Sequence, residues 1–513
     1  MNKFMNALTA NANYTTTENG AVAVKSCGDA LCDLFGRGAA YRDRSDEDCI
    51  LLFKKAFDEE PELAMKCLFY LYDVRGGTGE RRFFKVVAKW LAMNHIEAIE
   101  RNLAYIPEYG RWDAYYIFIG TPLQDKALRI MKHQLALDVK SYQAGKAISL
   151  IAKWLPSENA SSTESKKLAA ITRHAFGMTA KQYRKTLSTL REHLKVLERL
   201  MSENRWGEIS FDAIPSKAGF KYRNAFAKHD LERMRQNKEA TSYKDFIQDK
   251  NTKVNANVLY PYEVVAKAVN VMNPNFCSWP PRKCALDDTN RLAINKYWDN
   301  LKDYFNGCSL NALMVVDTSG SMWGNNADAP INVAISLGMY CAERNKGPWA
   351  GKYISFSRNP RLVEVEGIDF CDKVDRIYKT NLCENTDIER TFDMLLNTAI
   401  SSGCTQADLP STVLIVSDME FDAARGSYYS HGYNSSTLME NISRKWKRNG
   451  YKMPNLVFWN VRSHQDNMPM KMKDGITFVS GMSPVIFEMV MKGKTAKDLV
   501  LDKLNSERYA VIH

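Results

Sequence analysis

An apolar run that leads into a polar loop constrains the fold of this chain more than any other feature. Residues 310–316 are mostly apolar, and Asp317, Ser319 and Ser321 follow them directly. A short apolar run bounded by a turn is typical of a buried strand in a parallel sheet. Ligand sites in open α/β sheets gather at the carboxyl ends of such strands. We therefore predict a strand whose following loop carries a binding site.

The side chains of this loop suit a hard cation. One carboxylate and two hydroxyls stand at alternate positions, so that all three can turn inward. Mg²⁺ and Mn²⁺ prefer oxygen donors in octahedral geometry, and the absence of sulfur and imidazole from this loop argues against zinc. The alternative is a plain polar turn, because Asp, Ser and Gly also form turns for local reasons.

The pattern Asp-x-Ser-x-Ser after an apolar strand resembles the first segment of the metal-ion-dependent adhesion site (MIDAS) of von Willebrand factor A domains. In that family a Thr and an Asp from two later loops complete the metal shell. The resemblance assigns these roles to Thr386 and Asp418, which open a helix-like stretch and end an apolar run, respectively. It implies one divalent cation, Mg²⁺ or Mn²⁺, bound by Asp317, Ser319, Ser321, Thr386 and Asp418.

Further along the chain, apolar runs alternate with segments whose apolar residues recur at helical spacing. Apolar runs at 412–417, 456–461 and 476–479 predict buried strands, and residues 331–344, 388–400 and 438–449 have helical patterning. Strands that alternate with helices predict a doubly wound α/β domain with a parallel sheet.

The region before residue 305 is predicted to be all-α. Apolar residues recur at helical spacing in residues 48–72, 81–103, 125–137, 179–201 and 261–271, which predicts a stack of helix pairs. Prolines between 274 and 283 interrupt the pattern near the joint with the α/β region. We divide the chain into an N-terminal tail (1–20), a helical repeat domain (21–305) and an α/β domain (306–513).

The net charge of +11 belongs entirely to the first part. Residues 1–305 hold 47 Lys and Arg against 36 Asp and Glu, whereas residues 306–513 hold 23 of each. Residues 151–250 alone hold 20 basic against 12 acidic side chains. A basic domain joined to a neutral one suggests a polyanionic partner.

One predicted helix, 179–201, carries a candidate RNA-binding surface. Five basic side chains lie within about a quarter turn of one another on an ideal helix: Lys181, Arg184, Arg191, Lys195 and Arg199. The alternative is a solvated helix face, which is what most charge runs are.

Two motifs extend the resemblance to the first part. Residues 75–81 read Arg-Gly-Gly-x-Gly-Glu-Arg, and residues 106–113 read Ile-Pro-Glu-Tyr-Gly-Arg-Trp-Asp. Together with the A-like domain they resemble the TROVE module of the Ro ribonucleoproteins, and still more closely a group of plant and viral proteins with the same plan. This implies HEAT-like helical repeats that hold small non-coding or misfolded RNA. The Gly-rich segment lacks the Lys-Ser/Thr pair of a phosphate-binding loop, which argues against nucleotide binding.

Three hypotheses for function follow. The leading one is a non-enzymatic RNA-binding scaffold of Ro type. The second is a protein-interaction scaffold whose metal site captures an acidic partner residue. The third is a metal-dependent hydrolase, suggested only by the spacing of Asp418 and Glu420. Salt dependence separates the first two, because phosphate neutralisation makes affinity fall steeply with salt.

We expect a cytoplasmic protein with no membrane partner. Residues 1–20 lack a basic segment followed by an apolar one, and no apolar run reaches the roughly 20 residues that span a bilayer. The 11 Cys are odd in number and scattered, which favours reduced thiols.

Overall fold

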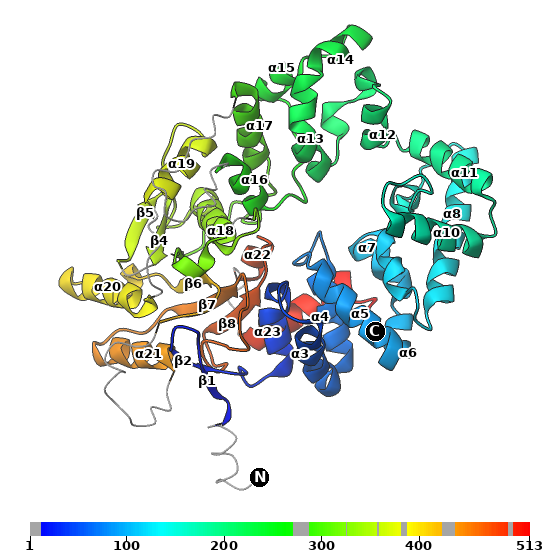
Figure 1. The fold of residues 1–513 in the computed structure, drawn as a ribbon. Coiled ribbons are helices and arrows are strands. Elements are labelled where there is room, and N and C mark those ends of the chain that lie inside the picture. The colour runs from blue at the N-terminus through cyan, green and yellow to red at the C-terminus, as the bar shows by residue number, and fades with distance from the viewer. Residues whose placement is uncertain are drawn as a thin grey trace.

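The helices and the sheet of this protein together form a ring. The computed structural model describes residues 12–269, 287–324, 326–356, 359–380, 387–422, 437–490 and 496–513. The helices from residue 30 to residue 299, which we call the helical arc, follow a curved path, and the α/β domain lies between the two ends of that path (Figure 1). The α/β domain therefore closes the arc.

The first half of the arc contains well-packed helices joined by short turns. The Ser45 side chain caps the helix that begins at Asp46, and Pro61 begins the next helix, so the stretch expected over 48–72 is two helices. The elements are α2 (Ala30–Arg37), η1 (Gly38–Ala40), α3 (Asp46–Glu59), α4 (Pro61–Tyr72), α5 (Arg81–Asn94), α6 (Ile96–Glu100), η2 (Leu103–Tyr105), α7 (Ile106–Tyr109), η3 (Trp112–Phe118) and α8 (Gln124–Gln143).

The second half of the arc consists mostly of shorter helices. The helix predicted over 179–201 is wrong as a single element: Lys195 adopts a φ of 46°, which a right-handed helix cannot contain. The elements are α9 (Ile151–Trp154), α10 (Thr163–Phe176), α11 (Ala180–His193), α12 (Leu197–Ser202), η4 (Trp206–Glu208), η5 (Phe211–Ala213), α13 (Ser216–Lys228), α14 (Asp230–Gln236), α15 (Tyr243–Gln248), α16 (Pro261–Ala268) and α17 (Asp288–Asp299).

The α/β domain is built on a six-stranded sheet with the order β5-β4-β3-β6-β7-β8. The strands are β3 (Ala312–Asp317), β4 (Lys352–Phe356), β5 (Arg361–Glu364), β6 (Thr412–Ser417), β7 (Asn455–Asn460) and β8 (Ile476–Ser480). β3, β4, β6, β7 and β8 run parallel, but β5 pairs antiparallel with β4. The sheet is therefore mixed, which corrects the expectation of a purely parallel one. The exposed edge strand β5 follows β4 after a short connection, which suits antiparallel pairing.

Helices pack on this sheet as the alternation of strands and helices predicted. α18 packs against β3, β4 and β6, and Gly338 lets it approach closely, because a Cβ there would lie 2.7 Å from Cγ2 of Val316. The helices and turns are η6 (Gly320–Met322), α18 (Pro330–Arg344), α19 (Phe370–Thr380), α20 (Ile388–Ser401), η7 (Gln406–Asp408), α21 (Leu438–Arg448), α22 (Ile486–Val490), α23 (Ala496–Leu504) and η9 (Glu507–Tyr509).

The start of the chain joins the sheet side of the ring. β1 (Tyr14–Thr16) and β2 (Val22–Val24) form a hairpin, and Val24 forms a bridge with Met468. α2 packs on β7 and β8, where a Cβ on Gly36 would lie 2.7 Å from the Cβ of Phe478. The described part of the expected tail, residues 12–20, is therefore ordered, while residues 1–11 lie outside the described residues.

The far end of the arc and the end of the chain complete the ring. Arg291 of α17 binds Asp369 at 2.6 Å, and Trp298 stacks on Phe370 with ring centres 4.2 Å apart. α16 packs against α18, and α23 packs against α4. The expected joint at 274–283 lies outside the described residues.

Two sequence expectations concern the environment of the protein. Within the described part of the chain, none of the helices combines the length and the apolar character that crossing a membrane requires. The eight cysteines in that part are free thiols.

Candidate functional site: the carboxyl edge of the sheet

Two adjacent strands at the centre of the sheet each lead into an aspartate. β3 and β6 pair in parallel up to Val316 and Val416, so Asp317 and Asp418 leave the sheet at the same edge. The chain runs from β3 to β4 on one side and later adds β6 on the other side of β3. Strand order reverses at this point, which is where open α/β sheets bind ligands.

Asp317 is fully buried and accepts two hydrogen bonds. Its Oδ1 accepts the backbone N–H of Ser319 at 2.9 Å, and its Oδ2 accepts the hydroxyl of Ser417 at 2.6 Å. The hydroxyl oxygens of Ser319 and Ser321 lie 3.3 Å apart. The first three predicted metal ligands are therefore close together.

Asp418 is 1% exposed and only partly satisfied. Its Oδ1 accepts the backbone N–H of Glu420 at 3.2 Å, but its buried Oδ2 has no hydrogen-bond partner among the described residues. The next residue, Met419, adopts a left-handed φ of 69°, and its N–H donates to the Ser417 hydroxyl at 2.9 Å. Strained backbone of this kind gathers at functional sites.

The electrostatics of the two aspartates reflect their burial. Burial and, next, the charge of Asp418 raise the pKa of Asp317 to about 7, although hydrogen bonds from Ser319 and Ser417 oppose the rise. Burial also raises the pKa of Asp418, opposed by the Ser321 hydroxyl and by His464. Two such carboxylates cannot both stay ionised cheaply without a counter-charge.

A divalent cation fits this donor set. Neither carboxylate pairs with a Lys or Arg side chain of the described residues, and Oδ2 of Asp418 is a buried oxygen without a donor. No cluster of three or more His, Cys, Asp and Glu suited to a metal occurs in the described ranges, so any cation here would depend on the serine hydroxyls. Thr386, the remaining predicted ligand, lies outside the described residues.

The N-terminal hairpin holds the loop that carries Asp418. The Thr17 hydroxyl donates to the carbonyl of Phe421 at 2.6 Å, and the N–H of Glu18 donates to the Glu420 carboxylate at 2.7 Å. Asn467 donates to the same carboxylate at 3.1 Å. Glu420 therefore positions this loop, and its contacts lend no support to a role as a hydrolytic base.

Sequence reasoning missed two side chains of this site. Ser417 lies one residue before a predicted ligand, and its hydroxyl donates to Asp317. His464 follows β7, 46 residues after Asp418, and its Nε2 lies 3.7 Å from Oδ2 of Asp418. Their position at the ends of predicted strands could have identified them, because residues after β3, β6 and β7 all leave the sheet at one edge.

The Gly-rich motif lies where the two ends of the helical arc approach each other. A Cβ on Gly77 would lie 1.9 Å from the carbonyl oxygen of Tyr70, and a Cβ on Gly79 would lie 2.1 Å from the hydroxyl of Tyr260. The Tyr260 hydroxyl donates to the carbonyl of Thr78 at 3.2 Å. Gly77 therefore lets the turn pack closely on α4, and Gly79 permits close packing between the two ends of the arc.

The second motif packs directly on the first. The N–H of Val74 donates to the carbonyl of Tyr109 at 3.1 Å, and the Arg75 side chain donates to the carbonyl of Glu108 at 2.9 Å. Gly110 leaves room for the ring of Tyr72, whose nearest atoms would lie 2.0 Å from an added Cβ. Both motifs thus have an architectural role in the structure.

The five basic side chains predicted to bind RNA do not form one stripe, because the helix breaks before Lys195. The Arg191 guanidinium donates to the carbonyls of Ala152 and Leu155, at 2.8 and 2.6 Å. Arg199 pairs with Glu192 and Glu203 at 3.0 and 2.8 Å. These two arginines hold neighbouring segments together, whereas Lys181 and Lys195 are exposed, and the exposed Arg184 pairs with Glu158 at 3.5 Å.

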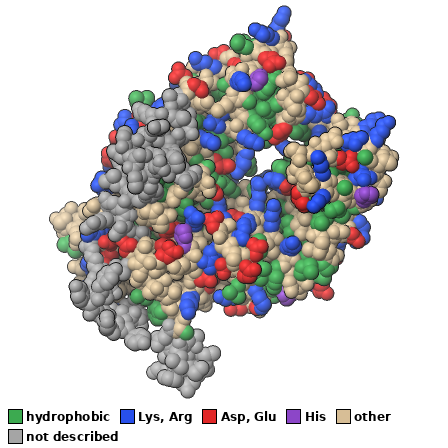
Figure 2. Space-filling model, viewed as in Figure 1, with side chains coloured by type: hydrophobic (Ala, Val, Ile, Leu, Met, Phe, Trp, Pro, Cys, Tyr) green, Lys and Arg blue, Asp and Glu red, His purple; other side chains and the backbone are tan. Residues whose placement is uncertain are grey.

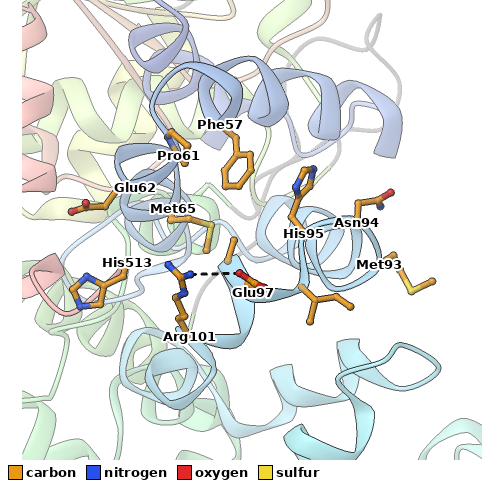
Figure 3. Close-up of a pocket in the computed structure, with 12 residues that line it drawn as sticks. Phe57, Pro61, Glu62, Met65, Met93, Asn94, His95, Glu97, Arg101 and His513 are labelled. Carbon is orange, nitrogen blue, oxygen red and sulfur yellow. Dashed lines mark ion pairs between the residues drawn. The ribbon is translucent and has the colours of Figure 1, made fainter.

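A separate pocket lies between α3, α4, α5 and α6 (Figure 3). It has a volume of about 960 Å³ and is lined by Phe57, Met65, His95, Arg101 and His513 among others. Arg101 pairs with Glu97 at 3.6 Å. The lining mixes apolar and oppositely charged side chains, so it offers no basic surface for a polyanion.

The fold and the polar cluster around Asp317 and Asp418 define a helical scaffold closed by an α/β domain that has a candidate cation site. Residues 17–109 and 123–304 match the domain of unknown function DUF2828, and residues 311–509 match the domain of unknown function DUF7788. Since the first match covers more than half of the chain, this protein belongs to the DUF2828 family.

Two known proteins are similar to this chain over most of its length. An uncharacterized protein of Acanthamoeba polyphaga mimivirus is 31% identical over 517 aligned positions, which cover 94% of this chain and 85% of the viral protein. The crystal structure of the Ro (RSR) protein of Deinococcus radiodurans matches 96% of both chains at 13% identity, with a TM-score of 0.36. A TM-score of 0.36 is too low to establish a shared fold, so the Ro and von Willebrand A resemblances remain predictions.

Proposed function

We propose that this protein is a non-enzymatic RNA-binding scaffold in which the helical arc binds small structured or misfolded RNA. The observation that carries this proposal is the placement of charge: the entire surplus of +11 belongs to residues 1–305. The arc surrounds a central hollow, and Lys and Arg side chains gather at part of its edge (Figure 2). A ring whose helical part carries a net positive charge suits a polyanion that threads through it or lies across it.

The second element of this proposal is a cation site in the α/β domain. Asp317, Ser319, Ser321 and Asp418, with Thr386 as a further candidate, would hold one Mg²⁺ or Mn²⁺. A shell with few carboxylates leaves part of the charge of the cation without compensation, so a phosphate or carboxylate of a partner can bind there. An acidic protein partner is the competing ligand for the same site.

The RNA proposal is tested by gel shifts of the full chain with a structured RNA at several salt concentrations. Replacing Lys181, Arg184 and Lys195 with Gln should weaken binding and reduce the salt slope by about one unit for each phosphate that is no longer neutralised. The matched control replaces three exposed lysines of the α/β domain, Lys346, Lys447 and Lys473, with Gln. Equal effects of the two triple variants would refute an RNA surface on α11 and the turn after it.

The cation proposal is tested by calorimetric titration with Mg²⁺ and with Mn²⁺. Asp317→Asn keeps the shape of the side chain and its hydrogen-bond acceptor but removes the charge, so saturable binding should disappear. Asp58→Asn, on the exposed face of α3, is the control for the change of charge. Unchanged affinity in the Asp317 variant would exclude the site.

Salt also separates RNA binding from protein binding. A protein partner captured at the cation site would lose affinity on chelation and on substitution of Asp317, but would depend on salt far less steeply. Hydrolysis remains the least supported alternative, because the Glu420 carboxylate that suggested it accepts hydrogen bonds from Glu18 and Asn467.

A further inference from the structure

His464 and Asp418 face each other at the carboxyl edge of the sheet, and each has an atom that lacks a partner. Nε2 of His464 lies 3.7 Å from Oδ2 of Asp418. Both atoms are buried, and neither has a hydrogen-bond partner within the described ranges. The distance is too long for a hydrogen bond, and buried polar atoms without partners are rare in folded proteins.

The distance suits two ligands of one cation. Ligand atoms at about 2.1 Å from a cation lie about 3 Å apart at a right angle and about 4.2 Å apart on opposite sides. The separation of 3.7 Å falls between these limits. A bound cation would therefore satisfy both orphan atoms at once.

The backbone that carries His464 is held in place from the arc. Its carbonyl accepts a hydrogen bond from the Arg44 guanidinium, and the N–H of Ser463 donates to the carbonyl of Ala40 at 3.0 Å. Arg44 also pairs with Asp466 at 3.3 Å. These three interactions fix this short segment beside Asp418, so the imidazole is presented to the site in advance.

We propose that His464 is a further ligand of the cation bound at Asp418, and that the site therefore favours a first-row transition ion, such as Mn²⁺ or Zn²⁺, over Mg²⁺. This inference rests on the proposed cation site. Imidazole nitrogen suits transition ions, whereas Mg²⁺ prefers an all-oxygen shell. All five ligands predicted from the sequence are oxygen donors, so His464 changes which metal the site selects.

The first test titrates the full chain with Zn²⁺, Mn²⁺ and Mg²⁺ separately by calorimetry. His464→Ala should weaken Zn²⁺ and Mn²⁺ binding by about tenfold or more and change Mg²⁺ binding by less than about twofold. His464→Gln supplies an oxygen in place of the nitrogen and should shift the preference toward Mg²⁺. His133→Ala, an exposed histidine on α8, is the matched control and should change nothing.

The second test detects the metal–nitrogen bond directly. Pulsed EPR of the Mn²⁺-loaded chain should show coupling to a histidine nitrogen in the wild type and in His133→Ala, but not in His464→Ala. This readout does not depend on affinity, and a melting curve of each metal-free variant establishes that it is folded.

The outcomes separate the two proposals. Metal binding by the wild type with no nitrogen coupling, and with the same affinities in His464→Ala, would overturn the role of His464 and leave the cation site in place. A lower melting temperature with unchanged metal affinities would mean that His464 and Asp418 form a plain ion pair, which also overturns it. No binding of any of the three cations by the wild type would overturn both proposals.

Discussion

The junction that closes the ring and the outer part of the arc use charged residues in opposite ways. At the ring-closing junction, which we define as residues 73–80 with their contacts, the buried Asp73 binds Arg508 and Tyr509 from the other end of the chain. In the outer arc, from α8 to α15, Arg205 pairs with Glu203 and Glu208, which are close in sequence and lie at the surface.

The comparison distinguishes charged side chains that stabilise the fold from charged side chains that are free to bind a partner. A pair between distant segments, in which the Asp73 carboxylate is buried and the Arg508 side chain is 31% exposed, holds the ring closed, and removing one partner leaves an uncompensated charge. Exposed local pairs contribute little to stability. The basic surplus of residues 151–250 lies in the outer arc. Binding of a polyanion to these side chains would therefore leave the ring closed.

The largest expected effect tests the junction. Asp73 accepts from Arg508 Nη2 at 2.7 Å, from the Tyr509 hydroxyl at 2.9 Å and from the N–H of Arg75 at 2.9 Å. Asp73→Asn keeps the size of the side chain but removes the charge that compensates Arg508. It should lower the free energy of unfolding by about 3 kcal/mol, measured by chemical denaturation.

The control for this change is the exposed pair of Lys54 and Asp58 on α3, in which both side chains are about half exposed. Asp58→Asn should cost no more than about 0.5 kcal/mol. Similar losses in the two variants would mean that the junction and the surface do not differ as the comparison requires.

The next effect concerns the strand-end cluster. A cation that binds only the folded chain stabilises it by about 2.7 kcal/mol at a concentration one hundred times its Kd. Mn²⁺ should therefore raise the melting temperature of the wild type, and Asp317→Asn should abolish the rise. A shift of equal size in both proteins would assign the stabilisation to some other site.

A smaller effect tests why the junction needs glycine. Gly79 has a φ of 69°, and an added Cβ would lie 2.1 Å from the Tyr260 hydroxyl. Gly79→Ala should therefore cost about 2 kcal/mol, from the left-handed backbone and from overpacking.

Tyr260→Phe should partly rescue that variant. It removes the clashing oxygen, and the nearest remaining ring atom lies 3.3 Å from the added Cβ. In the wild-type background the same change should cost about 1 kcal/mol, because it removes the hydrogen bond to Thr78. Simple addition of the two losses in the double variant would refute this account of the contact.

The smallest effect on stability belongs to the outer arc. The triple Gln variant at Lys181, Arg184 and Lys195 should change the free energy of unfolding by no more than about 0.5 kcal/mol for each substitution. Its RNA affinity should nevertheless fall. A clear loss of stability would show that these side chains are structural, as the contacts of Arg191 and Arg199 already are.

The sequence by itself determined the α/β domain and the heart of its candidate site. The apolar runs that became β3, β6, β7 and β8 were predicted within about two residues at each end, because a buried strand needs an unbroken apolar run. Asp317 and Asp418 could be placed together for the same reason, since adjacent parallel strands end at one edge. β4 and β5 were both missed. The side chains of β5 are mostly exposed, and the buried β4 reads Lys-Tyr-Ile-Ser-Phe, so neither has an unbroken apolar run.

Only the tertiary structure decided how the ring closes and which polar groups meet. Periodicity describes one helix at a time, so it could not show that Lys195 ends α11 early or that carbonyls of a neighbouring segment occupy Arg191. The contact between Asp73 and Arg508 and the approach of His464 to Asp418 depend on how whole faces pack. Packing joins residues that are distant in sequence, and no local pattern in a single chain encodes that pairing.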